Sequence, residues 1–297
     1  MEVMTNTTNP TTASKTTQAP ARQMRQMSNA IQRTARLVGL LILIMAVFAP
    51  FSMIYVPSTL IVPGDAATTA QNIMASEGLF RLGIASDAVV VLLEIVIVVL
   101  LYVLLKPVSK TLSLVAAFSR LAMTVIQGVN LLTHFVVLLL LSGAGYLTVF
   151  APDQLHALGL LFLNAHADVV LIWGLFFSLH LLVLGYLVYK SGYISRIPGV
   201  LLIMASLCYL TQSFGNILLP EYKGIFTAVG LLSAVEIALP LWLLIKGVNV
   251  AKWEKRVLEA ASMNLCRRDR DCVFEPAPVE HLPRDSEATR IATRVSE

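Results

Sequence analysis

The feature that most constrains this chain is a series of six long, mostly apolar runs. A helix needs about 20 mostly apolar residues to cross a bilayer, and each run approaches or exceeds that length. We therefore predict an all-α fold, an integral membrane bundle of six transmembrane helices. The six runs cover Leu37 to Tyr55, Ile84 to Leu105, Leu112 to Leu141, Leu158 to Tyr189, Ile197 to Leu219 and Ile225 to Ile245.

Composition supports a membrane protein and argues against a nucleic-acid-binding one. Of the 297 residues 57% are hydrophobic and only 13% are charged, whereas soluble domains carry about 25% charged residues. The net charge is +4, but the basic residues stand at the edges of the apolar runs and form no patch with interleaved aromatic residues. The expected partner is thus the lipid bilayer, and we expect no nucleic acid.

Lysine and arginine residues in the short loops predict the orientation. One side of the predicted bundle receives almost all of them, and the other receives only Arg81 and Lys223. Because basic loops stay in the cytoplasm, we expect both termini to be cytoplasmic and the protein to lie in the plasma membrane. The basic side carries Arg22, Arg25, Arg33, Arg36, Lys106, Lys110, Lys190, Arg196, Lys246, Lys252, Lys255 and Arg256.

The predicted domains follow from these spans. Residues 1–36 form a basic tail whose first 20 residues are too polar to fold, residues 37–248 form the transmembrane domain, and residues 249–297 form a second tail. In that second tail residues 253–265 have the pattern of an amphipathic helix, and the rest is expected to be disordered. Cys266 and Cys272 have five residues between them and no nearby His, which is no zinc spacing, so we interpret them as free thiols.

Polar side chains inside the third run recur at steps of seven residues, nearly two helical turns, so they share one face. Arg120 lies at the depth of Glu94 and Glu236 in neighbouring spans, and the three groups can form a buried ion pair or triad. One interpretation is that Arg120 only ties helices together, and the other is a polar cavity for an anionic or amphiphilic ligand. The candidate interior residues are Glu94, Arg120, Gln127, Asn130, His180, Tyr209, Asn216 and Glu236.

A second polar level is predicted nearer the outer surface, with Asp87, His134 and His166 at similar depth. Such a set suits zinc or a similar divalent metal, although lone histidines on membrane helices more often serve as hydrogen-bonded links. Haem ligation needs two histidines that face each other at one depth. His134 and His166 meet that condition, but no other feature supports electron transfer, so haem is not expected.

Three function classes remain open. Because the sequence contains no nucleophile elbow, no phosphate-binding glycine loop and no paired-aspartate motif, we favour a non-enzymatic protein that binds or carries a small ligand or ion. The alternatives are an intramembrane, metal-dependent enzyme that uses the outer group, and an accessory protein whose polar stripes only join helices.

Several stretches, taken in order, resemble the bacterial membrane proteins grouped as domain of unknown function 4386. The resemblance spans about Arg36 to Val248 and excludes both tails; family members often have Gly where Ser178 stands. It implies a six-helix bacterial membrane protein and supplies no reaction. The matching stretches are Val62 to Ala66, Leu79 to Ile84, Leu101 to Val108, Phe176 to His180, Gly185 to Gly192, Tyr209 to Phe214 and Leu241 to Gly247.

Overall fold

The computed structural model describes the backbone of residues 10–268 and the side chains of residues 26–262. The chain divides into two compact units, which are described separately. One unit, called the bundle here, is Thr34–Gly247, and the other joins residues before Thr34 to residues after Gly247. Within the described residues the regular elements are all helical, as the apolar runs predict.

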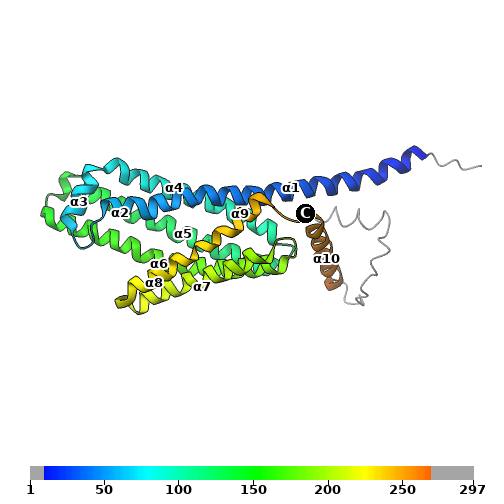
Figure 1. Cartoon of the computed structure of the whole chain (residues 1–297). Helices are drawn as coiled ribbons and strands as arrows, with labels where there is room; N and C mark the ends of the chain where they lie inside the picture. The colour runs from blue at the N-terminus through cyan, green and yellow to red at the C-terminus, as the bar shows by residue number, and fades with distance from the viewer. Residues whose placement is uncertain (1–9, 269–297) are drawn as a thin grey trace, which may run out of the picture. The chain divides into compact units, whose positions relative to one another are not determined.

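The helices of the bundle follow one another through short turns (Figure 1). The first span is continuous through three elements, α1, the π-helical η1 and α2, and the sixth through α8, the 3₁₀ helix η4 and α9. The bounds are α1 Pro10–Pro50, η1 Phe51–Tyr55, α2 Val56–Leu60, α3 Ala66–Ala75, α4 Glu77–Leu105, α5 Lys110–Leu140, η2 Gly145–Leu147, α6 Pro152–Ser191, α7 Arg196–Leu218, η3 Pro220–Tyr222, α8 Lys223–Leu231, η4 Leu232–Ile237, α9 Ala238–Ile245 and α10 Val250–Arg268.

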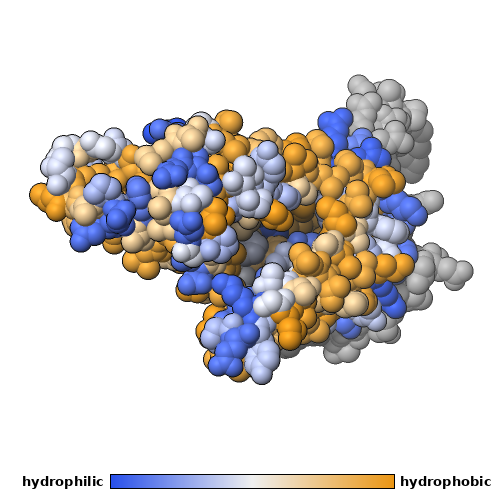
Figure 2. Space-filling view, turned by 60° about the vertical axis from the view of Figure 1, so that its left-hand side comes forward, coloured by the Kyte–Doolittle hydropathy of each residue, from blue (hydrophilic) through white to orange (hydrophobic). Residues whose placement is uncertain are grey.

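Six helical segments in the described residues are long and apolar enough to cross a membrane, which confirms the predicted fold class. Large apolar side chains cover their outward faces; Leu92 and Phe118, for example, are each 65% exposed. Figure 2 shows apolar residues, in orange, over much of the visible flank. Such a surface suits lipid rather than water, so the chain is a multi-pass membrane protein.

The bundle has two distinct ends, because successive spans run in opposite directions. At one end α4 meets α5 through Lys106, and we call this the Lys106 end. At the other end α2 and the short α3 pack against the long helices, and we call this the α3 end. Asp65 caps α3 by accepting a hydrogen bond of 2.9 Å from the Thr68 backbone N–H, as the sequence predicts.

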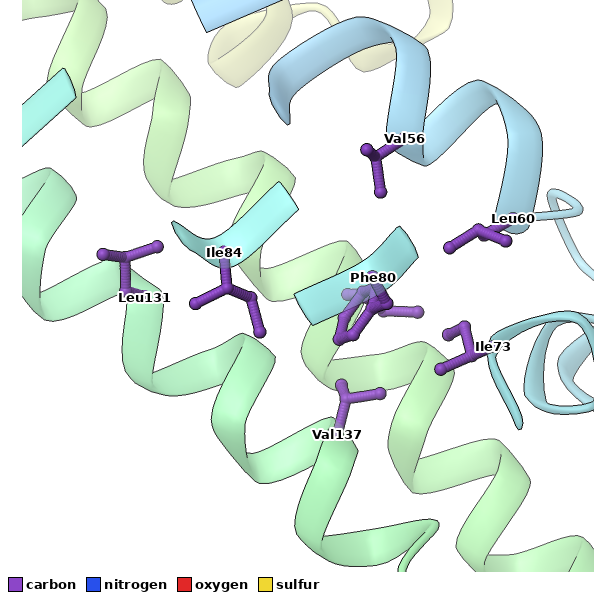
Figure 3. Close-up of a cluster of buried hydrophobic side chains, with 8 residues drawn as sticks. Val56, Leu60, Ile73, Phe80, Ile84, Leu131 and Val137 are labelled. Carbon is purple, nitrogen blue, oxygen red and sulfur yellow. The ribbon is translucent and has the colours of Figure 1, made fainter. Parts of the chain in front are cut away.

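A cluster of buried apolar side chains closes the α3 end of the bundle (Figure 3). Its members come from five helices, so it holds α2 and α3 against α4, α5 and α6. The fully or nearly fully buried residues are Val56, Leu60, Ile73, Phe80, Ile84, Leu131, Val137 and Leu163. Close van der Waals packing of such side chains stabilises this end of the bundle.

Small residues let the membrane helices approach one another closely. The carbonyl of Gly199 lies where a side chain on Gly185 would begin, so α6 and α7 touch through their backbones. Gly39 of α1 lies against the backbone of Pro240 and Leu244 in α9 in the same way. This packing is typical of membrane bundles, in which the hydrophobic effect does not drive helices together.

Two spans that the sequence predicts as continuous α-helices are interrupted. The first contains the π-helical segment Phe51–Tyr55 between Pro50 and Pro57. The sixth narrows to the 3₁₀ segment Leu232–Ile237. Pro240 has no N–H to bond the carbonyl of Glu236, four residues before it, so the α-helical pattern cannot pass through this point unchanged.

The second unit differs in part from the prediction. Helix α1 begins at Pro10, so helical structure extends into the segment expected to be disordered; its Ala, Arg, Gln and Met residues favour helix. The predicted helix over 253–265 lies within α10, where Trp253 is buried. The backbone N–H of Val248 donates to Gln32 Oε1 at 3.0 Å. Residues 1–9 and 269–297, and the side chains of Cys266 and Cys272, lie outside the described part.

Candidate functional site

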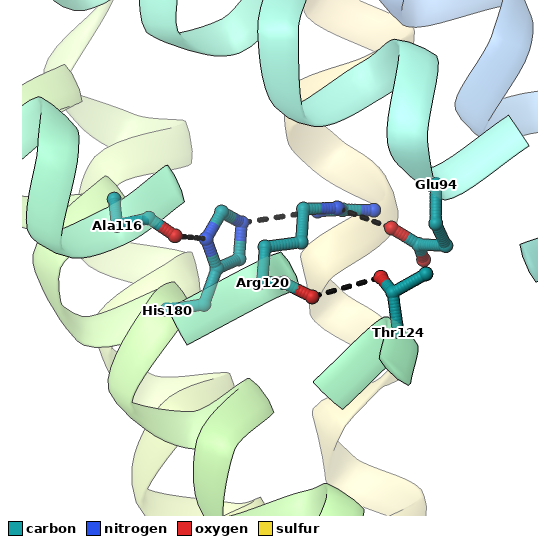
Figure 4. A network of polar contacts seen from close by, with 5 residues as sticks. All are labelled: Glu94, Ala116, Arg120, Thr124 and His180. Atoms are coloured by element: carbon teal, nitrogen blue, oxygen red, sulfur yellow. Dashed lines mark hydrogen bonds and ion pairs between the residues drawn. The ribbon is translucent and has the colours of Figure 1, made fainter. Parts of the chain in front are cut away.

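A charged cluster lies inside the bundle where α4, α5 and α6 meet (Figure 4). The guanidinium of Arg120 forms an ion pair with Glu94, donating through Nε to Oε2, and its Nη1 donates to His180 Nε2 at 3.0 Å. Arg120, Glu94 and His180 are only 3%, 5% and 1% exposed. The predicted contact between Arg120 and an interior carboxylate is therefore confirmed for Glu94.

The hydrogen bonds of His180 fix its protonation state. Its Nδ1 lies 2.8 Å from the carbonyl oxygen of Ala116, which can only accept, so Nδ1 carries the proton. Its Nε2 faces the Arg120 guanidinium, which can only donate, so Nε2 carries a lone pair. The imidazole is thus neutral and links two turns of α5 to α6.

The charged cluster lies near the middle of the membrane. Ten residues separate Arg120 from Lys110 at the start of α5, which is about 15 Å along the helix. Glu94 lies eleven residues before the end of α4, and His180 eleven residues before the end of α6, about 16 Å in each case. Since the hydrocarbon core is about 30 Å thick, all three side chains start close to its midplane.

Glu236, on the interrupted sixth span, lies at a similar depth in the membrane. It occupies the 3₁₀ segment η4, nine residues before the end of α9, about 14 Å along the helix. The hydroxyl of Tyr209 in α7 donates to its Oε1 at 3.1 Å. Arg120 and Glu94 both lie close enough to act electrostatically on its carboxylate. We call Glu94, Arg120, His180, Tyr209 and Glu236 the midplane centre.

Exposure separates the members of the midplane centre. Glu94, Arg120 and His180 are buried, whereas Glu236 and Tyr209 retain partial exposure. The ring of Phe177 lies between the two parts, with its centroid 5.9 Å from the guanidinium carbon of Arg120 and 5.0 Å from the Tyr209 ring. The buried ion pair therefore links the helices, and Glu236 is the carboxylate of the centre that keeps partial exposure.

A second polar group lies nearer the α3 end of the bundle. It begins seven residues before Glu94 on α4 and seven residues after Arg120 on α5. Gln127 Nε2 donates to Asp87 Oδ2 at 2.5 Å, and Asn130 Nδ2 donates to the carbonyl of His166 at 3.0 Å. The side chains of Asp87, Gln127 and Asn130 are all buried. Each also retains one buried oxygen atom without a hydrogen-bond partner.

His134 and His166 are brought together but do not form the predicted metal site with Asp87. Their rings stack with centroids 3.8 Å apart and an angle of 19°, and Asp87 instead bonds Gln127, seven residues before His134 along α5. In the part of the chain that the structure describes, no three His, Cys, Asp or Glu side chains are placed to hold a metal ion. Face-to-face rings at contact distance also leave no room for a haem iron between their nitrogens.

Two small cavities border the polar side chains of the described part of the bundle. Each has a volume of about 10 Å³, which is room for about one water molecule. One is lined by His134, Ser52 and apolar residues of the α3 end, and the other by His180 and Ser113. Neither could hold an anionic or amphiphilic organic ligand in this conformation.

The predicted interior residues thus lie in two groups, the midplane centre and the polar group of Gln127 and Asn130. Asn216 belongs to neither group. Asn216 is buried in the last turn of α7, and its Oδ1 has no partner. The pairing of Tyr209 with Glu236 was not predicted, nor was the helix interruption at Glu236, for which Pro240 is the signal in the sequence. The contacts of His166 Nδ1 were also missed. It lies 3.0 Å from Thr133 Oγ1 and 3.3 Å from the Asn130 carbonyl oxygen, which can only accept, and such contacts depend on the rotation of neighbouring helices.

Comparison with known proteins gives a family but no activity. A family model described as Domain of unknown function (DUF4386) matches residues 37–247. An uncharacterized protein of Archaeoglobus fulgidus is 28% identical over 166 residues, which cover 55% of this chain and 82% of that relative. No solved structure matches the chain.

Proposed function

We propose that this chain, which belongs to the DUF4386 family of domains of unknown function, is a membrane carrier that takes up and releases a proton at its midplane centre. Glu236 is the proposed loading group, and the buried pair of Arg120 and Glu94 is the fixed element beside it. The observation that carries the proposal is the position of Glu236, a partly exposed carboxylate outside the ion pair, in an interrupted helix halfway across the membrane.

The charge balance at the midplane centre supports a proton. It contains two carboxyl groups, Glu94 and Glu236, and one guanidinium, while His180 is neutral by its hydrogen bonds. Arg120 is already paired with Glu94, so an ionised Glu236 would add one uncompensated negative charge. Such a charge is costly in the hydrocarbon region, and a proton removes it.

The interrupted sixth span supports a carrier rather than an accessory protein whose polar residues only join helices. In secondary transporters, ion sites lie near the bilayer midplane and are typically formed by discontinuous helices. Here both halves of the span contact α7, but only one also packs on α1. Helix α8 packs on α7, where Gly215 accommodates the Phe226 ring, whereas α9 contacts α7 and packs on α1 at Gly39. The segment that contains Glu236 therefore connects two halves whose packing differs.

The two cavities that border the polar residues favour a proton over an organic ligand. Cavities of about 10 Å³ accept a water molecule but no metabolite. A carboxyl group, a hydroxyl group and single waters are sufficient to pass a proton. The proposed location is the plasma membrane with both termini in the cytoplasm, because Lys and Arg gather at the Lys106 end.

Transport by purified protein in liposomes tests the proposal. A trapped pH dye reports internal pH after a proton gradient is imposed, with an ionophore present to prevent a membrane potential from building up. We expect faster pH equilibration with wild-type protein than with protein-free liposomes, and a rate near background for Glu236→Gln. Asp168→Asn is the matched control, because Asp168 is an exposed carboxylate on α6. Background rates with the wild-type protein would contradict the proposal.

A further inference from the structure

The seam between α4 and α5 carries two acidic pairs in the same register. Asp87 of α4 pairs with Gln127 of α5, and Glu94 pairs with Arg120. Seven residues separate the two acids, and seven separate their partners, so the pairs lie at successive levels about 10 Å apart. They differ in one respect, because the pair nearer the α3 end has a neutral amide where the other has a guanidinium.

The carboxylate of Asp87 therefore lacks a counter-charge. Asp87 is 3% exposed, and within the described part of the chain its carboxylate accepts one side-chain hydrogen bond, from Gln127. Among the described residues, the recorded ion pairs are those of Arg81, Arg120 and Arg256, and none reaches Asp87. A buried carboxylate within a membrane span requires compensation by a proton, a cation or a basic partner, and the described chain supplies no basic partner.

Three oxygen atoms at this level have no hydrogen-bond partner. They are Asp87 Oδ1, Gln127 Oε1 and Asn130 Oδ1, and all belong to buried side chains. The amide orientations are fixed by their other atoms, because the Asp87 carboxylate and the His166 carbonyl accept hydrogen bonds and so require the amide nitrogens. Gln127 and Asn130 are three residues apart on α5, so their side chains are neighbours on one helical face.

We propose that Asp87, Gln127 and Asn130 form a binding site for one small alkali cation, sodium in the first instance, between α4 and α5. A proton would satisfy one of the free oxygens, whereas a hard cation is bound by several oxygen atoms at once. One carboxylate balances a single positive charge, and the described residues offer no cluster of acids or histidines for a divalent ion. The cation takes the position that the Arg120 guanidinium has at the midplane centre, and water completes its coordination.

This site is separate from Glu236, so its test does not depend on the proposed proton carrier. The purified full-length protein in detergent is equilibrated with radioactive sodium, and bound sodium is counted with choline chloride holding the ionic strength constant. We expect saturable binding near one ion per chain in the wild type and in Glu236→Gln. Binding should be lost in Asp87→Asn and retained in the control Asp168→Asn, which also removes one carboxylate but at an exposed position.

Gln127→Leu keeps the test decisive if Asp87→Asn fails to fold. Leucine fills a similar volume but has no oxygen atom to bind the ion. Sodium affinity should therefore fall about tenfold or more, as is typical when a group that supports a metal site is removed. Unchanged sodium binding in Asp87→Asn or in Gln127→Leu, or no saturable binding in the wild type, would overturn the site. Loss of proton transport in Glu236→Gln with intact sodium binding would support both proposals separately.

Discussion

Arg120 and Glu94 form an ion pair near the membrane midplane, with side chains only 4% and 6% exposed. The pair connects α5 to α4, and through His180 the same guanidinium connects both helices to α6. An ion pair so far from water leaves each charge without compensation when its partner is removed. The pair is therefore the feature on which the integrity of the bundle should depend most.

Replacing Arg120 with Met should destabilise the protein by about 3–5 kcal/mol, because Glu94 is left as a buried unpaired charge. Adding Glu94→Gln should recover part of that loss. Unfolding in mixed micelles, measured for the two single variants and the double variant, gives the coupling energy of the pair.

The matched control for this cycle is the exposed pair of Arg81 and Glu77, whose side chains are 59% and 51% exposed. Arg81→Met should change stability by at most about 1 kcal/mol, since surface ion pairs contribute little. Additive effects of Arg120→Met and Glu94→Gln would show that the two groups do not interact.

His180 should be a neutral imidazole with its proton on Nδ1. The Ala116 carbonyl requires a donor at Nδ1, and the Arg120 guanidinium requires a lone pair at Nε2. Nitrogen chemical shifts of histidine-labelled protein, assigned by comparison with His180→Gln, distinguish this form from the other tautomer and from imidazolium. An imidazolium signal, or a proton on Nε2, would contradict the hydrogen-bond network.

Gly39→Ala should destabilise the bundle, although alanine is the better helix former. A Cβ atom at residue 39 would overlap the Pro240 carbonyl and the Leu244 backbone, which cannot move aside as a flexible side chain could. We expect a loss of about 1–3 kcal/mol, as for other overpacked sites. Gly128→Ala in α5 is the control, because its Cβ would meet only an ordinary contact with Val91; equal losses at both sites would refute the close α1–α9 packing.

The cap of α3 should depend on pH. Thr68 donates two hydrogen bonds to the Asp65 carboxylate and holds the pKa of Asp65 below its ordinary value of 3.8. A depressed pKa means that the cap contributes its full stability above about pH 4 and loses it as pH falls through the folded-state pKa. Hydrogen exchange of the α3 amides should show this loss in the wild type and not in Asp65→Asn, which caps without a charge.

The sequence was sufficient to predict the six spans and the depth of their polar groups. Apolar length marks a membrane helix strongly, and steps of seven place Arg120, Gln127 and His134 on one face of α5. Together with alternating helix direction, this predicted that Arg120 would meet a carboxylate of a neighbouring span. It also predicted that His134 would approach His166.

The sequence did not predict which polar groups bond to each other or where helices are interrupted. Asp87 bonds Gln127 rather than joining the histidines, because the relative rotation of α4 and α5 is set by packing along their whole length. The 3₁₀ segment at Glu236 lies just before Pro240, and it packs against α7 together with α8 and α9. Such effects arise from tertiary contacts that apolar periodicity does not contain.

Infrared spectroscopy of the Glu236 carboxyl group tests the central claim most directly. If Glu236 takes up and releases a proton at the midplane centre, the wild-type protein should show a protonated carboxyl band whose intensity changes with pH and whose frequency shifts in heavy water. That component should disappear in Glu236→Gln and persist in Asp168→Asn. A spectrum in which Glu236→Gln removes no pH-dependent carboxyl band would contradict the account.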